Sequence, residues 1–139
     1  MKKLDEFVKQ GRLKKAAFNE DMYKKEYDIG KKDYDAAIES FESGNHKWAT
    51  IQAYYAIFHA VRALVYKAGY REESHLALKA ALKELYIEPG ILPKSVYETL
   101  ERGMDLREMA DYKDSYSKRG AENLISVVKS AIEEVKRIL

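Results

Sequence analysis

Apolar residues recur at helical spacing along most of the chain. One stripe runs through residues 20–43 with spacings of four, seven, four and three, and it consists of Tyr23, Tyr27, Tyr34, Ile38 and Phe41. These spacings keep the stripe on one side of an α-helix for about five turns. Gly44 follows the last apolar residue, where helices commonly end, so we expect this helix to stop there.

The most apolar segment of the chain runs from Ala53 to Tyr66 and contains no Gly or Pro. Its polar side chains are not scattered. These side chains are Tyr55, His59, Arg62 and Tyr66. Their spacings of four, three and four place them on one line of an α-helix. Because the remaining faces are apolar, we expect a helix over 46–67 that other helices surround.

Three further helices are predicted in the second half of the chain. Ser74 is a good N-cap for a third helix that begins with His75 and has Leu76 on its apolar side. Pro93 suits the first turn of a fourth helix, and Ser117 can cap the last. The connections are short, and we find no alternating pattern that predicts a strand. The sequence therefore predicts an all-α, up-and-down four-helix bundle built from residues 20–43, 46–67, 75–86 with 93–110, and 118–138.

The N-terminal residues differ from the rest in charge. Residues 1–32 contain 10 Lys and Arg against 6 Asp and Glu, whereas the remaining 107 residues contain 15 against 17. Residues 3–17 show an amphipathic helical pattern, with apolar residues near one side and lysines elsewhere. We expect a basic N-terminal helical arm over 1–19 and a bundle domain over 20–139. The arm is either a solvated helix face or a contact for nucleic acid or an acidic partner.

Composition excludes several classes of site. The chain of 139 residues has no cysteine, so it has neither disulfides nor a thiolate ligand or nucleophile. The three histidines at 46, 59 and 75 lack the spacing of metal ligands, and no glycine-rich phosphate loop precedes a helix. We therefore expect no metal and no cofactor. No apolar run is long enough to span a membrane and no signal peptide is recognisable, so we expect a cytoplasmic protein without membrane contact.

The polar line of the central helix is the candidate site. In a bundle it could face His75 at the start of the third helix and, near the end of the fourth, Arg107, Asp111 and Tyr112. Arg62 needs an acidic partner if it is buried, and Asp111 is one candidate. His59 could equally be a hydrogen-bonded core residue.

His75 suggests catalysis. At a helix N-terminus its neutral form is favoured, so it could accept a proton. Arg71 or Arg62 beside it could stabilise the charge that develops on phosphorus during phosphodiester cleavage. The candidate catalytic residues are therefore His75 and Arg71.

The segment from Gln52 to Leu64, followed by Gly69 and Ser74-His75, resembles the HEPN domain (higher eukaryotes and prokaryotes nucleotide-binding). The stretch from Arg107 to Tyr112 is similar to the family's Arg-x-x-Ala-Asp-Tyr element. The resemblance covers about residues 20–138. It implies an all-α bundle that is often a homodimer.

The resemblance implies two kinds of function. Some members are metal-independent endoribonucleases, often toxins, that use an Arg-x(4–6)-His motif at a dimer cleft. Others bind nucleotide or RNA, or accompany a small nucleotidyltransferase as its partner in a toxin–antitoxin-like pair. Three residues separate Arg71 from His75, so the nuclease motif is not matched. We therefore expect a binding protein or nucleotidyltransferase partner, with the ribonuclease and a non-catalytic helical interaction module as alternatives.

Overall fold

The computed structural model describes residues 2–139, apart from the side chain of Lys2. Helices account for almost all of its regular structure. In chain order the elements are α1 (Lys2–Lys9), β1 (Leu13–Lys15), α2 (Glu20–Glu42), α3 (His46–Lys67), β2 (Tyr70–Glu72), α4 (His75–Leu82), the π-helix η1 (Lys83–Ile87), α5 (Lys94–Tyr112) and α6 (Lys118–Ile138). The predicted all-α class is confirmed, and the four long helices lie close to their predicted ranges.

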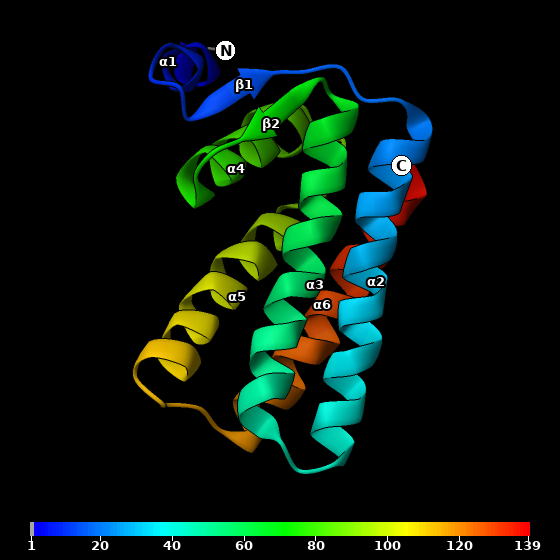
Figure 1. Cartoon of the computed structure of the whole chain (residues 1–139), viewed down its shortest axis with the longest axis vertical. Helices are drawn as coiled ribbons and strands as arrows, with labels where there is room; N and C mark the ends of the chain where they lie inside the picture. The colour runs from blue at the N-terminus through cyan, green and yellow to red at the C-terminus, as the bar shows by residue number, and fades with distance from the viewer. Residues whose placement is uncertain (1) are drawn as a thin grey trace.

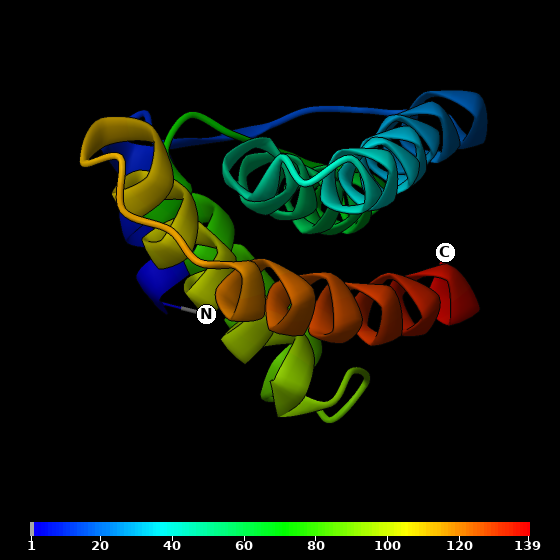
Figure 2. The ribbon, with the colours of Figure 1, turned by 90° about the horizontal axis from the view of Figure 1, so that it is seen from below.

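The four long helices form an up-and-down bundle around α3. Figure 1 shows α2 and α3 side by side and antiparallel, with α5 on the other side of α3 and α6 behind. Seen from below, α6 runs beneath the α2–α3 pair (Figure 2). α3 packs extensively against α2, α5 and α6, which explains why so much of its surface is apolar. Among the described residues, no helix is both long and apolar enough to cross a membrane.

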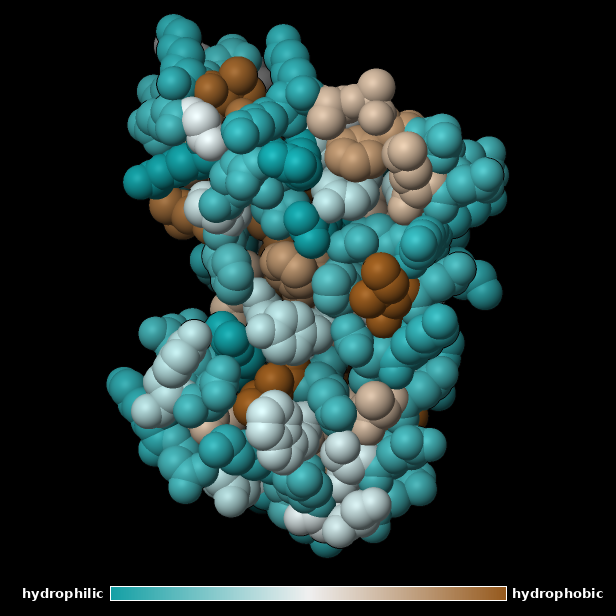
Figure 3. Space-filling view, in the orientation of Figure 1, coloured by the Kyte–Doolittle hydropathy of each residue, from teal (hydrophilic) through white to brown (hydrophobic). Residues whose placement is uncertain are grey.

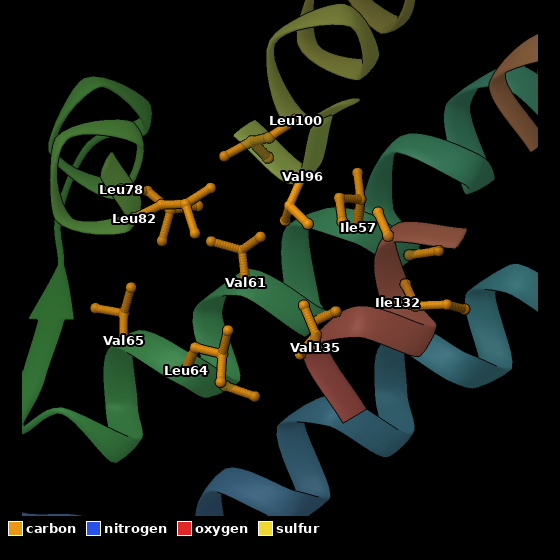
Figure 4. Close-up of a cluster of buried hydrophobic side chains, with 14 of the residues drawn as sticks. Ile57, Val61, Leu64, Val65, Leu78, Leu82, Val96, Leu100, Ile132 and Val135 are labelled. Carbon is orange, nitrogen blue, oxygen red and sulfur yellow. The ribbon is translucent and has the colours of Figure 1, made fainter. Parts of the chain in front are cut away.

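The hydrophobic core follows the apolar faces of α3. Val61, Leu64 and Val65 are completely buried and extend from α3 toward the neighbouring helices in Figure 4. α4 packs against them through Leu78 and Leu82, which are also fully buried. Burying an aliphatic side chain of this kind stabilises the fold by about 1.5–3 kcal/mol. The core therefore fixes which residues of α3 remain available for polar contacts.

Two glycines set how closely the neighbouring helices approach α3. A Cβ atom at Gly30 of α2 would lie 2.7 Å from the backbone oxygen of Ala56 and 3.2 Å from the Cβ of His59. A Cβ atom at Gly103 of α5 would lie 3.2 Å from the Cδ1 atom of Tyr54. Glycine thus lets α2 approach the backbone of α3 on one side and lets α5 approach a side chain of α3 on the other.

The N-terminal arm is not the single helix that we predicted over 3–17. α1 ends at Lys9, the chain turns at Gly11 with a φ of 73°, and β1 then pairs antiparallel with β2. The sequence shows no alternating pattern for these two strands, because strands of three residues are too short to display one. Leu4, Phe7 and Leu13 are buried in the main core, so the arm is packed against the bundle.

The helix caps explain several boundaries. The side chain of Ser74 accepts a hydrogen bond from the backbone of Ala77 at 3.1 Å, and that of Ser117 accepts one from Gly120 at 2.9 Å, as predicted. The third helix, predicted over 75–86, is divided in the structure: α4 ends at Leu82 and the π-helix η1 follows it. α5 extends to Tyr112, two residues beyond the predicted end. This extension places Asp111 one helical turn after Arg107.

Candidate functional site

A cavity of about 430 Å³ lies between the start of α4 and the second half of α5. α4 contributes His75, Leu76 and Lys79 to its walls, α5 contributes residues from Met104 to Tyr112, and Tyr54 of α3 lies at its base. The outline of the molecule is notched at the left of Figure 3, at the level between α4 and α5 in Figure 1. We refer to this cavity as the His75 pocket.

His75 is held by the N-terminus of α4 and by an aromatic contact. Its Nδ1 atom lies 3.2 Å from the hydroxyl of Tyr54 and shares a hydrogen bond with it. The ring of Phe58 lies 5.7 Å away, centroid to centroid. Burial lowers the pKa of His75 below its usual value, and the positive charge of Arg107 lowers it further. The ring is therefore neutral at pH 7 and can accept a proton.

Arg107 lies among three tyrosine rings. Its guanidinium carbon is 5.9 Å from the ring centre of Tyr54, 5.6 Å from that of Tyr55 and 5.2 Å from that of Tyr112. Nη2 donates a hydrogen bond to the hydroxyl of Tyr55 at 3.0 Å and lies 3.3 Å from the Asp111 carboxylate. The buried Nε donates to no group among the described residues. Arg107 thus has one carboxylate partner and a donor that remains unused.

A second polar cluster lies further along α3, where Phe58 separates it from His75, and we call it the Arg62 cluster. Nε of Arg62 is 2.9 Å from the carboxylate of Glu72 in β2, and Nη1 is 3.5 Å from that of Glu26 in α2. His59 contacts Glu26 through Nδ1 at 2.8 Å and Asp33 through Nε2 at 3.7 Å. Glu26 and Glu72 are both at least nine-tenths buried. Burial raises the pKa of Glu72, opposed by the charge of Arg62.

The polar line of α3 therefore divides between two places. Tyr55 reaches Arg107, whereas His59 and Arg62 face α2 and β2. Arg62 pairs with Glu72 and Glu26. Asp111, the candidate partner of Arg62 in the sequence, pairs with Arg107 instead. The candidate residues therefore form two neighbouring groups, which meet at Phe58.

Of the two remaining predicted residues, one borders the Arg62 cluster and one lies outside both polar groups. Tyr66 stacks on Phe18 of the arm with ring centres 4.0 Å apart, and the guanidinium carbon of Arg62 is 5.2 Å from its ring centre. Arg71 is exposed on β2 and bonds to Glu73 with a shortest distance of 2.6 Å, and it does not line the His75 pocket. The pairing of His75 with Arg71 stays a prediction, and the geometry favours Arg107 as the cation near His75.

Sequence reasoning missed six of the residues that line the pocket, which are Tyr54, Leu76, Lys79, Met104, Asp105 and Glu108. The apolar pattern places Tyr54 in the core and Leu76 on the buried side of its helix, and it gives no role to Lys79. Leu76 is 53% exposed, so its expected burial is wrong. The spacing of four between His75 and Lys79 could have indicated that both lie on one face of α4.

No group of three or more potential ligands that could hold a metal ion occurs among the residues that the structure describes. The cavity instead combines the cations Lys79 and Arg107 with the carboxylates of Asp105 and Glu108. The exposed aromatic ring of Tyr112 lies at its edge and is 69% accessible. Such a lining can bind phosphate through the cations and a planar base through the tyrosine.

Comparison with known proteins identifies the family. A protein of Methanocaldococcus jannaschii named "Putative toxin MJ0605" is 25% identical to this chain over 113 residues, which cover 81% of this chain and 84% of that protein. The model of the HEPN domain family matches residues 23–138 and leaves the whole N-terminal arm outside. The resemblance predicted from the central helix is confirmed, and this chain belongs to the HEPN domain family.

Proposed function

We propose that this HEPN protein binds RNA, and that the His75 pocket holds the phosphate groups of the RNA. The proposal rests on the surroundings of Arg107. Its side chain is 19% exposed and is held by tyrosine rings, and it has only one carboxylate partner among the described residues. A planar guanidinium in a fixed position is suited to bidentate contacts with phosphate oxygens. Lys79, on the α4 wall of the pocket, supplies a second cation, which is paired with the carboxylate of Glu101 at 3.0 Å.

The aromatic residues favour RNA over free phosphate as the ligand of the pocket. Tyr112 is largely exposed at the edge of the pocket and lies next to Arg107. A base that stacks on an exposed tyrosine gains about 1–3 kcal/mol, whatever its identity. The pocket is therefore expected to bind single strands, whose bases are free to stack.

Fluorescence polarisation with a labelled single-stranded RNA tests this proposal. Arg107→Gln should weaken binding by about tenfold or more, because it removes a charged donor from the phosphate contact. Arg102→Gln is the matched control, since Arg102 is an exposed arginine of the same helix that does not line the pocket. Equal loss in both variants would mean that binding depends only on net charge, and the proposed pocket would be wrong.

A metal-independent endoribonuclease is the second candidate, and the lowered pKa of His75 favours it. A neutral His75 would take the proton from a ribose 2′-hydroxyl, whose oxygen attacks the adjacent phosphorus to form a 2′,3′-cyclic phosphate, while Arg107 stabilises the developing charge. The bond from phosphorus to the 5′-oxygen breaks, and the leaving 5′-oxygen takes a proton from water. Incubation of RNA with the protein in EDTA is the test. Intact RNA with the wild type, or equal cleavage by His75→Gln, would contradict this candidate.

A toxin–antitoxin-like pair is the biological setting that we propose for either activity. The relative from Methanocaldococcus jannaschii supports it by its name, and the family resemblance adds a small nucleotidyltransferase as the partner and a homodimer as the assembly. Co-purification with a nucleotidyltransferase encoded by a neighbouring gene tests the partner, and light scattering tests the homodimer. A monomer that binds no such enzyme would contradict both.

A further inference from the structure

The N-terminal arm forms a second hollow beside the His75 pocket. This hollow measures about 150 Å³ and lies between the arm and the exposed side chain of Leu76. The arm lines it with Lys3, Gln10 and Arg12, together with Glu6 and the buried Phe7.

Shared walls connect the two hollows. Leu76 lines both of them, and it also lines a third hollow of about 100 Å³ between α4 and α5. Lys79 belongs to the His75 pocket and the third hollow, and Lys3 belongs to the third hollow and that of the arm. The three hollows therefore adjoin one another along α4, and we call the row of them, from Arg107 at one end to Arg12 at the other, the recess.

Cations occupy both ends of this recess. Arg107 and Lys79 lie at the pocket end, and Lys3 and Arg12 lie at the arm end. Neither Lys3 nor Arg12 forms an ion pair within the part of the chain that the structure describes. Glu6, Glu84 and Glu88 also line the recess, so its lining is mixed. Carboxylates suit the amino groups of bases and cations suit phosphates, so a mixed lining fits a nucleic acid strand better than a simple polyanion.

The arm end is held in place by the fold. The backbone oxygen of Arg12 accepts a hydrogen bond from the backbone of Glu73 at 2.7 Å. The next residue, Leu13, is fully buried and pairs with Glu72 across the two strands. A cation on fixed backbone loses less entropy on binding than one on a mobile tail.

From this geometry we infer that the N-terminal arm is a second RNA-binding subsite, which contacts phosphates of the same strand that enters the His75 pocket. The inference rests on the proposed function, because the pocket must bind the strand first. It adds that the ligand is an oligonucleotide longer than the pocket itself. It also gives a role to residues that lie outside the match to the HEPN family.

Two RNA probes separate this inference from the proposed function: a dinucleotide, which the pocket alone can hold, and a single strand of about eight nucleotides. The double variant Lys3→Gln/Arg12→Gln should weaken binding of the longer strand roughly tenfold. It should also reduce the slope of log affinity against log salt by about 1.4, or about 0.7 for each phosphate that the variant no longer neutralises. Dinucleotide binding should not change.

The control removes two charges from the same arm outside the recess. Lys9→Gln/Lys15→Gln changes exposed residues that line none of the three hollows, and it should reduce affinity less than twofold. The inference is overturned if both double variants weaken the longer strand equally, or if the wild type binds the longer strand no more tightly than the dinucleotide. If the wild type binds neither probe, the proposed function fails together with the inference.

Discussion

Arg62 of α3 and Arg107 of α5 both contact the polar line of the central helix, but their surroundings differ. Arg62 has two carboxylate partners, whose side chains are only 11% (Glu26) and 8% (Glu72) exposed. Arg107 has a single carboxylate at 3.3 Å, a hydroxyl and three aromatic rings, and it lies in the wall of a cavity. The charge of Arg62 is satisfied by two carboxylates of the fold, whereas that of Arg107 has one carboxylate partner and borders a cavity. The comparison assigns Arg62 to the scaffold and Arg107 to the candidate site.

The largest effect is expected from Arg62→Met. The substitution leaves Glu26 and Glu72 buried without their cation, and unfolding by urea should show a loss of about 3 kcal/mol. RNA affinity of the folded fraction should stay within twofold of the wild type. Adding Glu72→Gln to Arg62→Met should recover part of the lost stability, because it removes one of the uncompensated charges. A loss below about 0.5 kcal/mol would show that the cluster does not support the fold.

Gly30→Ala should destabilise by about 2 kcal/mol, because a methyl group there meets the backbone of Ala56 and must push α2 from α3. The loss is partly offset by the better helix propensity of alanine. Gly103→Ala is the control on the candidate-site side of α3. Its methyl group meets a side-chain atom of Tyr54, which can shift, so its cost should be clearly smaller. Urea unfolding of both variants measures this, and the reverse order would mean that the α3–α5 contact is the tighter one.

Arg107→Met should cost only about 1 kcal/mol in stability, because the single hydrogen bond to Tyr55 is removed while Asp111 remains 35% exposed to water. The same variant should lose RNA binding. Measuring both quantities on Arg62→Met and Arg107→Met separates scaffold from site. If the two variants lose stability equally and bind RNA equally, the distinction between the two arginines is wrong.

The sequence predicted the parts of the fold that depend on local chemistry. The long helices, the caps at Ser74 and Ser117 and the buried apolar faces of α3 follow from spacing and from single residues. The family was recognised from the central helix and from the segment Arg107–Tyr112.

The partners of the polar residues could not be predicted in the same way. Glu72, which pairs with Arg62, belongs to a strand of only three residues that shows no pattern in the sequence. Successive side chains of a strand point to opposite faces, so Arg71 is exposed while Glu72 is buried. Asp111 reaches Arg107 because α5 continues past Ala110, and helix ends are the least certain part of such predictions.

Glu72→Gln should have the smallest effect, and that effect should depend on pH. The pKa of Glu72 is raised in the folded state, so the folded protein holds this proton more tightly than the unfolded chain does. The resulting stabilisation is present below the unfolded pKa and is lost as pH rises through the folded pKa. Relative to the wild type, Glu72→Gln should therefore become more favourable as pH rises from about 4 to 7. Urea unfolding at several pH values measures this, and the opposite trend would mean that pairing with Arg62 outweighs burial.

The most direct test of the division between scaffold and site uses the histidines. The chain has three, so their ring resonances can be followed separately by NMR, with His75→Gln to assign the signal of His75. Without ligand, the pKa of His75 should lie below the usual histidine range. Adding a short RNA should shift its resonance and raise its pKa, because a bound phosphate favours the protonated ring, while the signals of His59 stay in place. Movement of the His59 signals with those of His75 unchanged would contradict this division and assign the ligand to the Arg62 cluster.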